Sequence, residues 1–255
     1  MDLGHLMWRL LVGYPQPAEM IDHRYPTWLQ RPGGLVLTLL VTALSLALGL
    51  VIGCLLALGD RATSAGPDVD PIERVMRRGL RALLRAFIEI VRGLPIMLLV
   101  LLVFYLPYRL FAIRAPAAVL AIVAFSIYAG VYLCEILLAG FRSVDRDLLA
   151  AGQVLGLSPW KVFLRIELPI AARNMSPDLI NLAVTVFKDT STLAVVAMAE
   201  LTYTGRIVLA SEPAQYAGVM FLVLVYYWIP ATLLSAAALR MDRRRATARL
   251  PHIPV

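Results

Sequence analysis

Residues Leu35–Leu58 have the sequence LVLTLLVTALSLALGLVIGCLLAL and contain no charged side chain. A helix rises about 1.5 Å per residue, so this segment is long enough to cross the ~30 Å hydrocarbon layer of a membrane. The chain has 255 residues, of which 60% are hydrophobic and 16% are charged, and its mean hydropathy is +0.76. A soluble domain of this length is less apolar and carries more charge. The sequence therefore predicts an all-α, multi-pass membrane protein.

Five membrane-spanning helices are predicted from the apolar blocks. Backbone polar groups inside lipid must be hydrogen-bonded within their own segment, so each block is expected to be a helix. The expected spans are Leu35–Leu58, Ala86–Pro107, Pro116–Gly140, Leu179–Leu201 and Tyr216–Leu239.

The spans divide the chain into three parts. Residues 1–33 are expected to form an interfacial or extracytoplasmic segment, because they contain several of the aromatic residues that favour membrane interfaces. Residues 34–240 form the transmembrane domain, with a loop at about 141–176, and residues 241–255 form a basic tail. The aromatic residues are Trp8, Tyr14, Tyr25 and Trp28.

Positive charge gathers in the segments 61–85, 142–173 and 240–249, which lie on one side of a five-span chain. The positive-inside rule places this side in the cytoplasm, with the N-terminus outside and the C-terminus inside. The net charge of +7 is thereby explained by topology, and no nucleic-acid partner is expected.

Several chemistries are excluded. Cys54 and Cys134 lie inside predicted spans and indicate no disulfide. The three histidines are scattered and have no second ligand at metal spacing, so no metal site is expected. The chain has no P-loop motif and no hydrolase or metalloprotease motif. We therefore expect no enzyme active site and no cofactor bound by this chain.

A polar-flanked loop, Ala150–Pro169, interrupts the apolar blocks with the sequence AAGQVLGLSPWKVFLRIELP. Asp145 or Asp147 is expected to cap a helix over Leu148–Leu155, and Gly156 is typical of the position just after a helix C-terminus. A membrane protein rarely needs such an element for its own stability.

A second short helix is expected to begin at Ser158 and Pro159 and to end at Pro169. Each helix has one apolar or small-residue face at helical spacing. These faces either pack on the protein's own membrane domain or dock into a groove of a partner. The first face comprises Leu148, Ala151, Gly152 and Leu155, and the second comprises Trp160, Phe163 and Leu164.

This loop resembles the EAA loop of ABC transporter permease subunits. The resemblance rests on Ala151-Gly152, Gly156, Ile166 and Leu168-Pro169, which stand at the spacing of that motif. Three further stretches, FIEIVRGLP at 87–95, YLCE at 132–135 and FKDTST at 187–192, resemble the polar amino-acid uptake branch. The resemblance covers the chain from about Gly34 to its end.

The resemblance implies a cytoplasmic coupling helix that sits in a cleft of an ATPase subunit. The chain departs from the family at Ala150, where glutamate is usual, and at Gly152, where alanine is usual. One charge-assisted contact, typically worth about 1.5–3 kcal/mol, is therefore missing. The residues implied in coupling are Ala150, Ala151, Gly152, Leu155, Gly156, Trp160, Phe163, Ile166, Leu168 and Pro169.

Charged residues inside the spans point to the substrate. Each costs about 2.5–3.5 kcal/mol at mid-membrane, so it needs a partner or a cavity. A zwitterionic amino acid needs one cationic and one anionic anchor; our hypothesis is that Arg92 or Lys188 binds the carboxylate and that Glu135 or Asp189 binds the ammonium. The alternative is a static network or a gate, in which Glu89 pairs with Arg92. The predicted pathway comprises Glu89, Arg92, Gly93, Pro95, Glu135, Lys188, Asp189, Thr190 and Ser191.

Taken with the resemblance, these features predict the permease subunit of an ATP-driven amino-acid importer in a bacterial cytoplasmic membrane. The implied partners are ABC ATPase subunits that carry ATP and Mg²⁺, a second permease subunit, an extracytoplasmic substrate-binding protein and membrane lipid. The alternatives are a permease for another small polar solute and a structural or regulatory membrane subunit. A secondary transporter is disfavoured, because the sequence has no visible inverted repeat.

Overall fold

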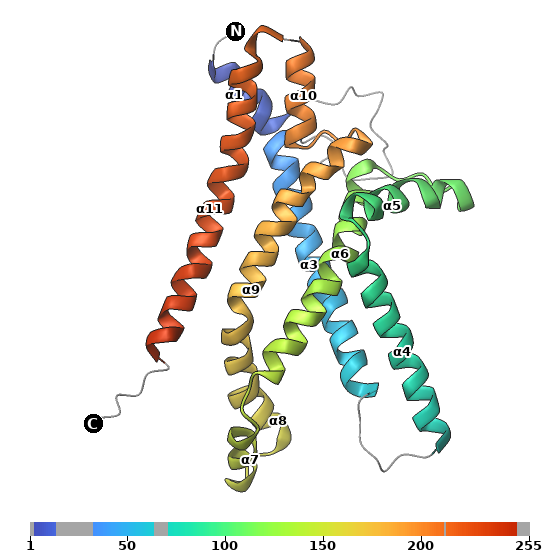
Figure 1. Cartoon of the computed structure of the whole chain (residues 1–255), viewed down its shortest axis with the longest axis vertical. Helices are drawn as coiled ribbons and strands as arrows, with labels where there is room; N and C mark the ends of the chain where they lie inside the picture. The colour runs from blue at the N-terminus through green and yellow to red at the C-terminus, as the bar shows by residue number, and fades with distance from the viewer. Residues whose placement is uncertain (1–2, 14–32, 64–70, 212, 249–255) are drawn as a thin grey trace.

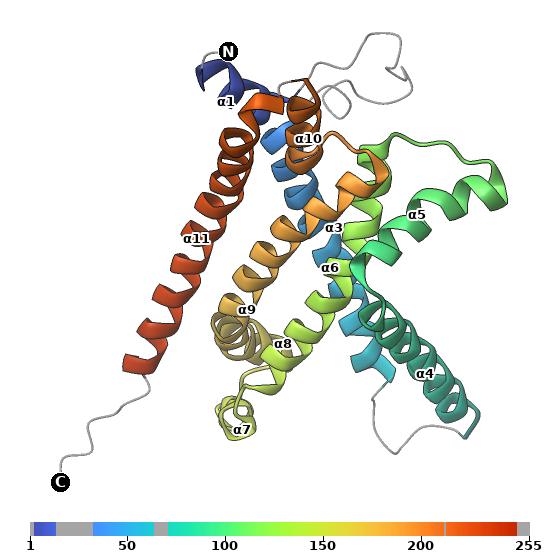
Figure 2. The same cartoon turned by 45° about the horizontal axis from the view of Figure 1, so that its top comes forward.

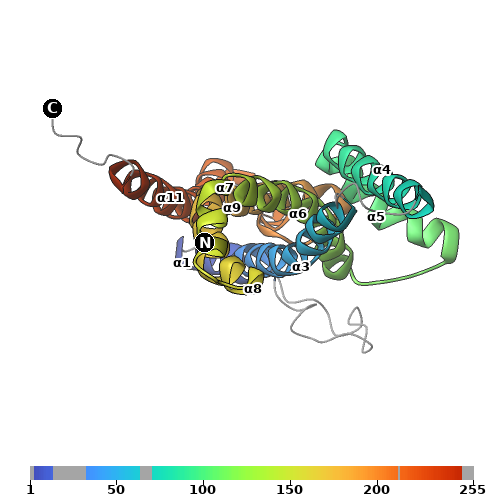
Figure 3. The same ribbon diagram turned by 90° about the horizontal axis from the view of Figure 1, so that it is seen from below.

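The computed structural model describes residues 3–13, 33–63, 71–211 and 213–248, and every named element in these ranges is helical. The helices form an elongated bundle around α3, α6 and α9, with α11 on one side and α4 with α5 on the other (Figures 1 and 3). In chain order the elements are α1 Leu3–Val12, α3 Gly34–Thr63, α4 Pro71–Gly93, α5 Ile96–Phe111, α6 Ala117–Arg142, α7 Arg146–Val154, α8 Pro159–Val162, η2 Phe163–Glu167, α9 Leu168–Asp189, η3 Thr190–Val196, α10 Leu201–Ser211, η4 Pro213–Gln215 and α11 Tyr216–Ala248.

The predicted multi-pass helical fold is confirmed. Four helical stretches of the described ranges are long and apolar enough to cross a membrane: Gly34–Thr63, Ala117–Arg142, Pro159–Val196 and Pro213–Arg240. The helices Glu73–Gly93 and Ile96–Phe111 pass the same test together but are bent by 108°.

The second predicted span, Ala86–Pro107, is wrong as one continuous helix. Helix α4 ends at Gly93 and α5 begins at Ile96, so the chain breaks around Pro95. Proline has no N–H to donate and disfavours the helical conformation of the residue before it. Figure 2 shows α5 running outward from the end of α4.

The fourth predicted span, Leu179–Leu201, lies mostly inside the membrane-length helical stretch Pro159–Val196 but wrongly extends five residues past its end. Glu200 lies beyond it and is completely buried. Its carboxylate accepts hydrogen bonds from the backbone N–H groups of Thr202 at 2.8 Å and Tyr203 at 2.7 Å and from the hydroxyl of Tyr227 at 2.8 Å. Glu200 therefore caps α10 and ties it to α11.

Helices α3 and α6 approach closely through glycines. A β-carbon on Gly53 would lie 2.8 Å from Cβ of Leu133 and 2.9 Å from the carbonyl oxygen of Gly130. A β-carbon on Gly130 would in turn lie 2.6 Å from Ile52 Cγ2. Small residues at such contacts allow helix backbones to pack in a membrane, where the hydrophobic effect does not drive association.

The N-terminal helix packs on the body of the protein. Leu6 and Leu10 are buried with Leu201, Val208 and Val219 in a cluster formed by α1, α10 and α11. Trp8 is 64% exposed. The other aromatic residues predicted to lie at an interface, Tyr14, Tyr25 and Trp28, are outside the described residues, as is the end of the basic tail after Ala248.

The close packing at Gly53 predicts that a larger side chain at this position of α3 lowers the stability of the protein. We expect Gly53→Val to destabilise the protein by about 1–3 kcal/mol, since the backbone of α6 has to move away. Thermal unfolding in detergent measures the loss. The matched control is Gly79→Ala on α4, where a β-carbon meets nothing within 4 Å and a stabilising change of about 0.5–1 kcal/mol is expected. Equal unfolding temperatures for the two variants would contradict the proposed packing.

Candidate functional site

The loop Ala150–Pro169 folds as the end of the short helix α7, a glycine turn, and a second arm, α8 and η2, that continues into α9. Asp145 caps α7, and its Oδ1 accepts a hydrogen bond from the N–H of Asp147 at 2.9 Å. Gly156 has a φ of +77°, its N–H donates to Gln153, and the N–H of Leu157 donates to Gly152. These two bonds satisfy the last carbonyls of α7 in the pattern known as a Schellman motif. The predicted cap and break are confirmed.

Gly152 allows the two arms of the loop to touch. It is the only buried residue of α7, and a β-carbon there would lie 2.8 Å from Ile166 Cδ1 and 3.3 Å from Val162 Cγ2. Ala150 and Ala151, in contrast, are exposed. Among the three small residues at the start of the loop, Gly152 shapes the loop itself, and the two alanines are on its surface.

An apolar surface covers the outer side of the loop. Leu155 is 80% exposed, Val154 88% and Trp160 66%. Leu148 and Leu164 are also exposed. Exposed apolar residues gathered on a polar-flanked loop indicate an interaction surface. Helical periodicity identified Leu155 and Trp160 but missed Val154, which lies one residue off the predicted face.

Pro169 does not end the second helix, contrary to prediction. The chain continues from α8 through the π-helix η2 into α9, and the N–H of Leu168 donates to the carbonyl of Phe163, five residues earlier. Proline cannot donate a hydrogen bond, and the wider π-turn, frequent at functional sites, lets the helix pass this position. Leu168 is half-buried and Pro169 is exposed. The loop is thereby joined rigidly to a membrane-spanning helix.

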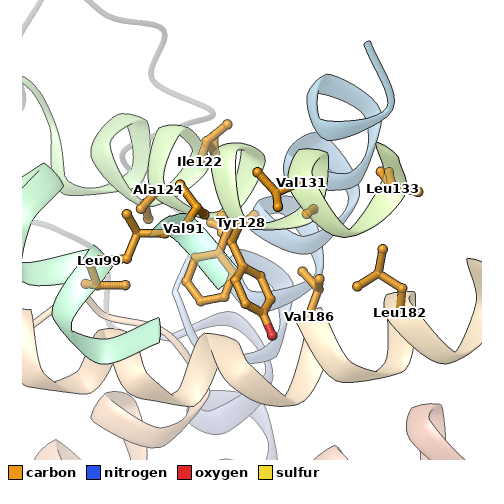
Figure 4. Packing of buried hydrophobic residues seen from close by; sticks show 14 of the residues in the cluster. Val91, Leu99, Ile122, Ala124, Tyr128, Val131, Leu133, Leu182 and Val186 are labelled. Carbon is orange, nitrogen blue, oxygen red and sulfur yellow. The ribbon is translucent and has the colours of Figure 1, made fainter. Parts of the chain in front are cut away.

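Polar side chains on α4 and α9 meet two tyrosines of α6, one of which, Tyr128, is labelled among its apolar neighbours in Figure 4. The hydroxyl of Tyr128 reaches toward α9 and donates to Asp189 Oδ2 at 3.1 Å. The rings of Tyr128 and Tyr132 have centroids 4.9 Å apart. The Cζ atom of Arg92 lies 5.9 Å from the centre of the Tyr132 ring, and Arg92 Nη1 lies 3.8 Å from Glu89 Oε1. The structure thus connects charges of α4 and α9 through two tyrosines, of which Tyr128 was missed by the sequence analysis.

Glu135 lies in a different place from Asp189. It lines a cavity of about 170 Å³ together with residues of α3, α4 and α6. Asp60, which sequence reasoning also missed, is buried at the edge of this cavity and pairs with Arg85 at 3.1 Å and Arg81 at 3.3 Å. A single acidic residue at the end of the apolar first span, before a run of arginines, was the available signal. The lining residues are Asp60, Arg85, Ile88, Glu89, Glu135, Leu138 and Arg142.

The other predicted pathway residues have distinct environments. Lys188 is exposed on α9, whereas Thr190 is buried and donates its hydroxyl hydrogen bond to Phe187 at 2.6 Å. Ser191 is half-buried. Gly93 and Pro95 lie at the bend between α4 and α5. Within the described ranges no three His, Cys, Asp or Glu residues gather as a metal site.

Residues 49–247 match the family described as "Binding-protein-dependent transport system inner membrane component". The chain belongs to this family. It is therefore a membrane-embedded transport permease subunit of the ABC class, as the loop resemblance implied.

Curated relatives of this chain include several amino-acid permeases. The glutamine transport system permease protein GlnP of Escherichia coli strain K12 is 33% identical over 212 residues, covering 83% of this chain and 90% of the relative. The glutamate/aspartate import permease protein GltK of Escherichia coli O6:H1 is 30% identical, with coverage of 84% and 92%. The L-cystine transport system permease protein TcyB of Bacillus subtilis strain 168 is 27% identical, with coverage of 92% and 94%.

Solved structures share the fold. An amino-acid ABC transporter crystallised with histidines superimposes with a TM-score of 0.69 at 23% identity, covering 82% of this chain and 91% of that chain. The MetNI methionine ABC transporter in an inward-facing conformation has a TM-score of 0.61 at 21% identity, with coverage of 83% and 94%.

Proposed function

We propose that this chain forms half of the transmembrane pathway of an ATP-driven importer for a polar amino acid in a bacterial inner membrane. The proposal rests on two features found together in one member of this family: a loop with an apolar surface, and exposed charges at Lys188 on a membrane-length helix and at Glu89 on α4. The loop is suited to bind a partner protein, and the charges are suited to line a polar path for the substrate.

The exposed charges argue for a second permease subunit. Lys188 is exposed on a membrane-length helix, and the side chain of Glu89 is 74% exposed on α4. Charged groups facing hydrocarbon are costly, and in membrane proteins they face the bundle interior or a water-filled cavity. A second permease subunit that covers these surfaces, identical or homologous, encloses a shared path and shields the charges from lipid.

An amino acid is the substrate class that the charges and the relatives support together. Lys188 presents a cation for a carboxylate, and Asp189 on the same helix turn presents an anion for an ammonium group. Arg92 is a second cationic candidate, and Thr190 and Ser191 follow directly in sequence. Relatives whose names specify glutamine, glutamate/aspartate and L-cystine share this general substrate chemistry.

The loop docks an ATPase subunit in this proposal. Val154, Leu155 and Trp160 insert as apolar anchors, and Ala150 and Ala151 allow close backbone approach. The ATPase carries ATP and Mg²⁺, whereas this chain binds no nucleotide and catalyses no reaction. The loop side and the C-terminus face the cytoplasm, the N-terminus faces outward, and an extracytoplasmic binding protein delivers substrate on that outer side.

The domain boundaries follow the same scheme. Residues 34–240 form the permease domain with the docking loop at about 141–176, residues 1–33 form the outward-facing segment, and residues 241–255 form the cytoplasmic tail. A permease for another small polar solute would share these boundaries and differ only in the side chains along the pathway. A structural or regulatory subunit would lack transport altogether.

Docking predicts a specific effect of charge at the apolar surface. Leu155→Asp is expected to weaken binding of a co-expressed amino-acid-transporter ATPase subunit about 30-fold, as for loss of one buried apolar anchor. Leu155 is 80% exposed in the isolated chain, so folding is unaffected. Co-purification and binding titration measure the change.

Two matched variants sharpen this experiment. Gln153→Glu adds the same charge two residues from Leu155 without removing an apolar anchor, and Ala150→Glu restores the charge usual in the family. Both are expected to bind at least half as well as wild type. If Leu155→Asp bound normally, or if all three variants failed alike, the apolar docking surface would be refuted.

If the charges along the predicted pathway bind the substrate, removing one of them should raise the KM for uptake. Lys188→Met and Asp189→Asn are each expected to raise the KM for amino-acid uptake by about 10- to 100-fold, because a charge-assisted contact of ~1.5–3 kcal/mol is lost. Uptake by the assembled complex in proteoliposomes measures the change. Glu73→Gln, at an ion pair with Arg77 on α4, is the control and should leave KM unchanged. Loss of assembly without a change in KM would instead assign both residues a structural role.

A further inference from the structure

A stack of four side chains joins the loop to the two central membrane helices. Arg61 at the end of α3 lies over the ring of Phe141 on α6, with Cζ 4.1 Å from the ring centre. Phe141 stacks on Phe163 of η2 with centroids 6.0 Å apart and planes at 25°. Phe163 stacks on Trp160 of α8 at 5.6 Å and 23°. The stack therefore runs from the tip of the loop to α3.

An ion pair between Arg61 and Glu167 gives Arg61 a second, direct contact with η2. Arg61 Nη2 lies 3.1 Å from Glu167 Oε1, and the Glu167 side chain is only 18% exposed. Glu167 and Phe163 are the two ends of the π-helix η2. Arg61 thus holds both ends of the segment that carries the loop into α9, once through Phe141 and once directly.

We propose that Arg61 is a positioning residue that transmits movement of the docked loop to α3 and α6. A cation over an aromatic face and a nearby carboxylate restrain the guanidinium from two directions. Trp160 is 66% exposed and belongs to the docking surface, so displacement of the loop reaches Arg61 through the stacked rings. Because α3 and α6 pack closely at their glycines, a displacement of Arg61 moves both helices together.

The inference rests on the proposed function, since it needs a docked ATPase. Its distinct content is that transmission needs residues that lie outside the docking surface, while Trp160 belongs both to that surface and to the stack. Leu155 and Val154 on the surface determine whether the ATPase binds. Arg61, Phe141 and Glu167 determine whether hydrolysis by the bound ATPase moves the membrane helices.

The test measures transport per ATP hydrolysed in proteoliposomes that contain the permease, the ATPase and the binding protein. Arg61→Ala is expected to retain the ATPase on co-purification and to lower transport per ATP about tenfold. Phe141→Leu is expected to act in the same direction. The double variant is expected to be no worse than Arg61→Ala alone, because both changes break one link. Arg78→Ala, at an exposed arginine of α4, is the matched control and should behave as wild type.

A second measurement covers the case in which Arg61→Ala assembles poorly. Hydrogen exchange of the purified permease should become faster over residues 163–167 in Arg61→Ala and remain unchanged in Arg78→Ala. The role of Arg61 would be overturned if Arg61→Ala kept the wild-type values of transport per ATP and of hydrogen exchange. It would also be overturned if Arg78→Ala changed both quantities as much as Arg61→Ala. A wild-type chain that binds no ATPase would overturn the proposed function, and this inference with it.

Discussion

The close contact of α3 with α6 is the interaction on which the rest of the structure depends. In lipid there is little hydrophobic drive for one helix to prefer another, so association relies on packing that side chains on both helices permit. Gly53 and Gly130 supply that packing by removing the atoms that would otherwise collide. The end of α3 is thereby held beside the end of α6, which places Arg61 over Phe141.

This contact also helps to fix the position of the loop, whose α7 arm is short and whose α8–η2 arm continues into α9. The loop has almost no core of its own, and Gly152 is the only buried residue of α7. It is held instead by Gly152 against Ile166, by the stacking of Phe163 on Phe141 of α6 and by the continuous helix through Pro169. A surface held in this way keeps Val154 and Leu155 exposed, and in the proposed mechanism a partner bound to it also moves the membrane helices.

Sequence reasoning succeeded where local chemistry decides the outcome and failed where packing does. Asp145 and Gly156 predicted the ends of α7, because caps depend on a few neighbouring residues. Ser158 and Pro159 predicted where α8 begins, although the Ser158 side chain makes no capping hydrogen bond. The prediction that Pro169 ends the helix was wrong, because a π-turn accommodates the hydrogen bond that proline cannot donate. No local sequence rule predicts such a turn. The separation of Glu135 from Asp189, and the bridging role of Tyr128, depend on how α6 is rotated against α4 and α9, which a single sequence does not reveal.

The central claim is that this permease moves an amino acid only when a docked ATPase hydrolyses ATP. The most direct measurement is uptake of radiolabelled glutamine, glutamate and cystine into proteoliposomes that contain the permease, the ATPase and the binding protein, with and without enclosed ATP. We expect accumulation of at least one of these amino acids with ATP and none without it. Equal uptake by vesicles that hold the permease alone would show that transport does not depend on a docked ATPase.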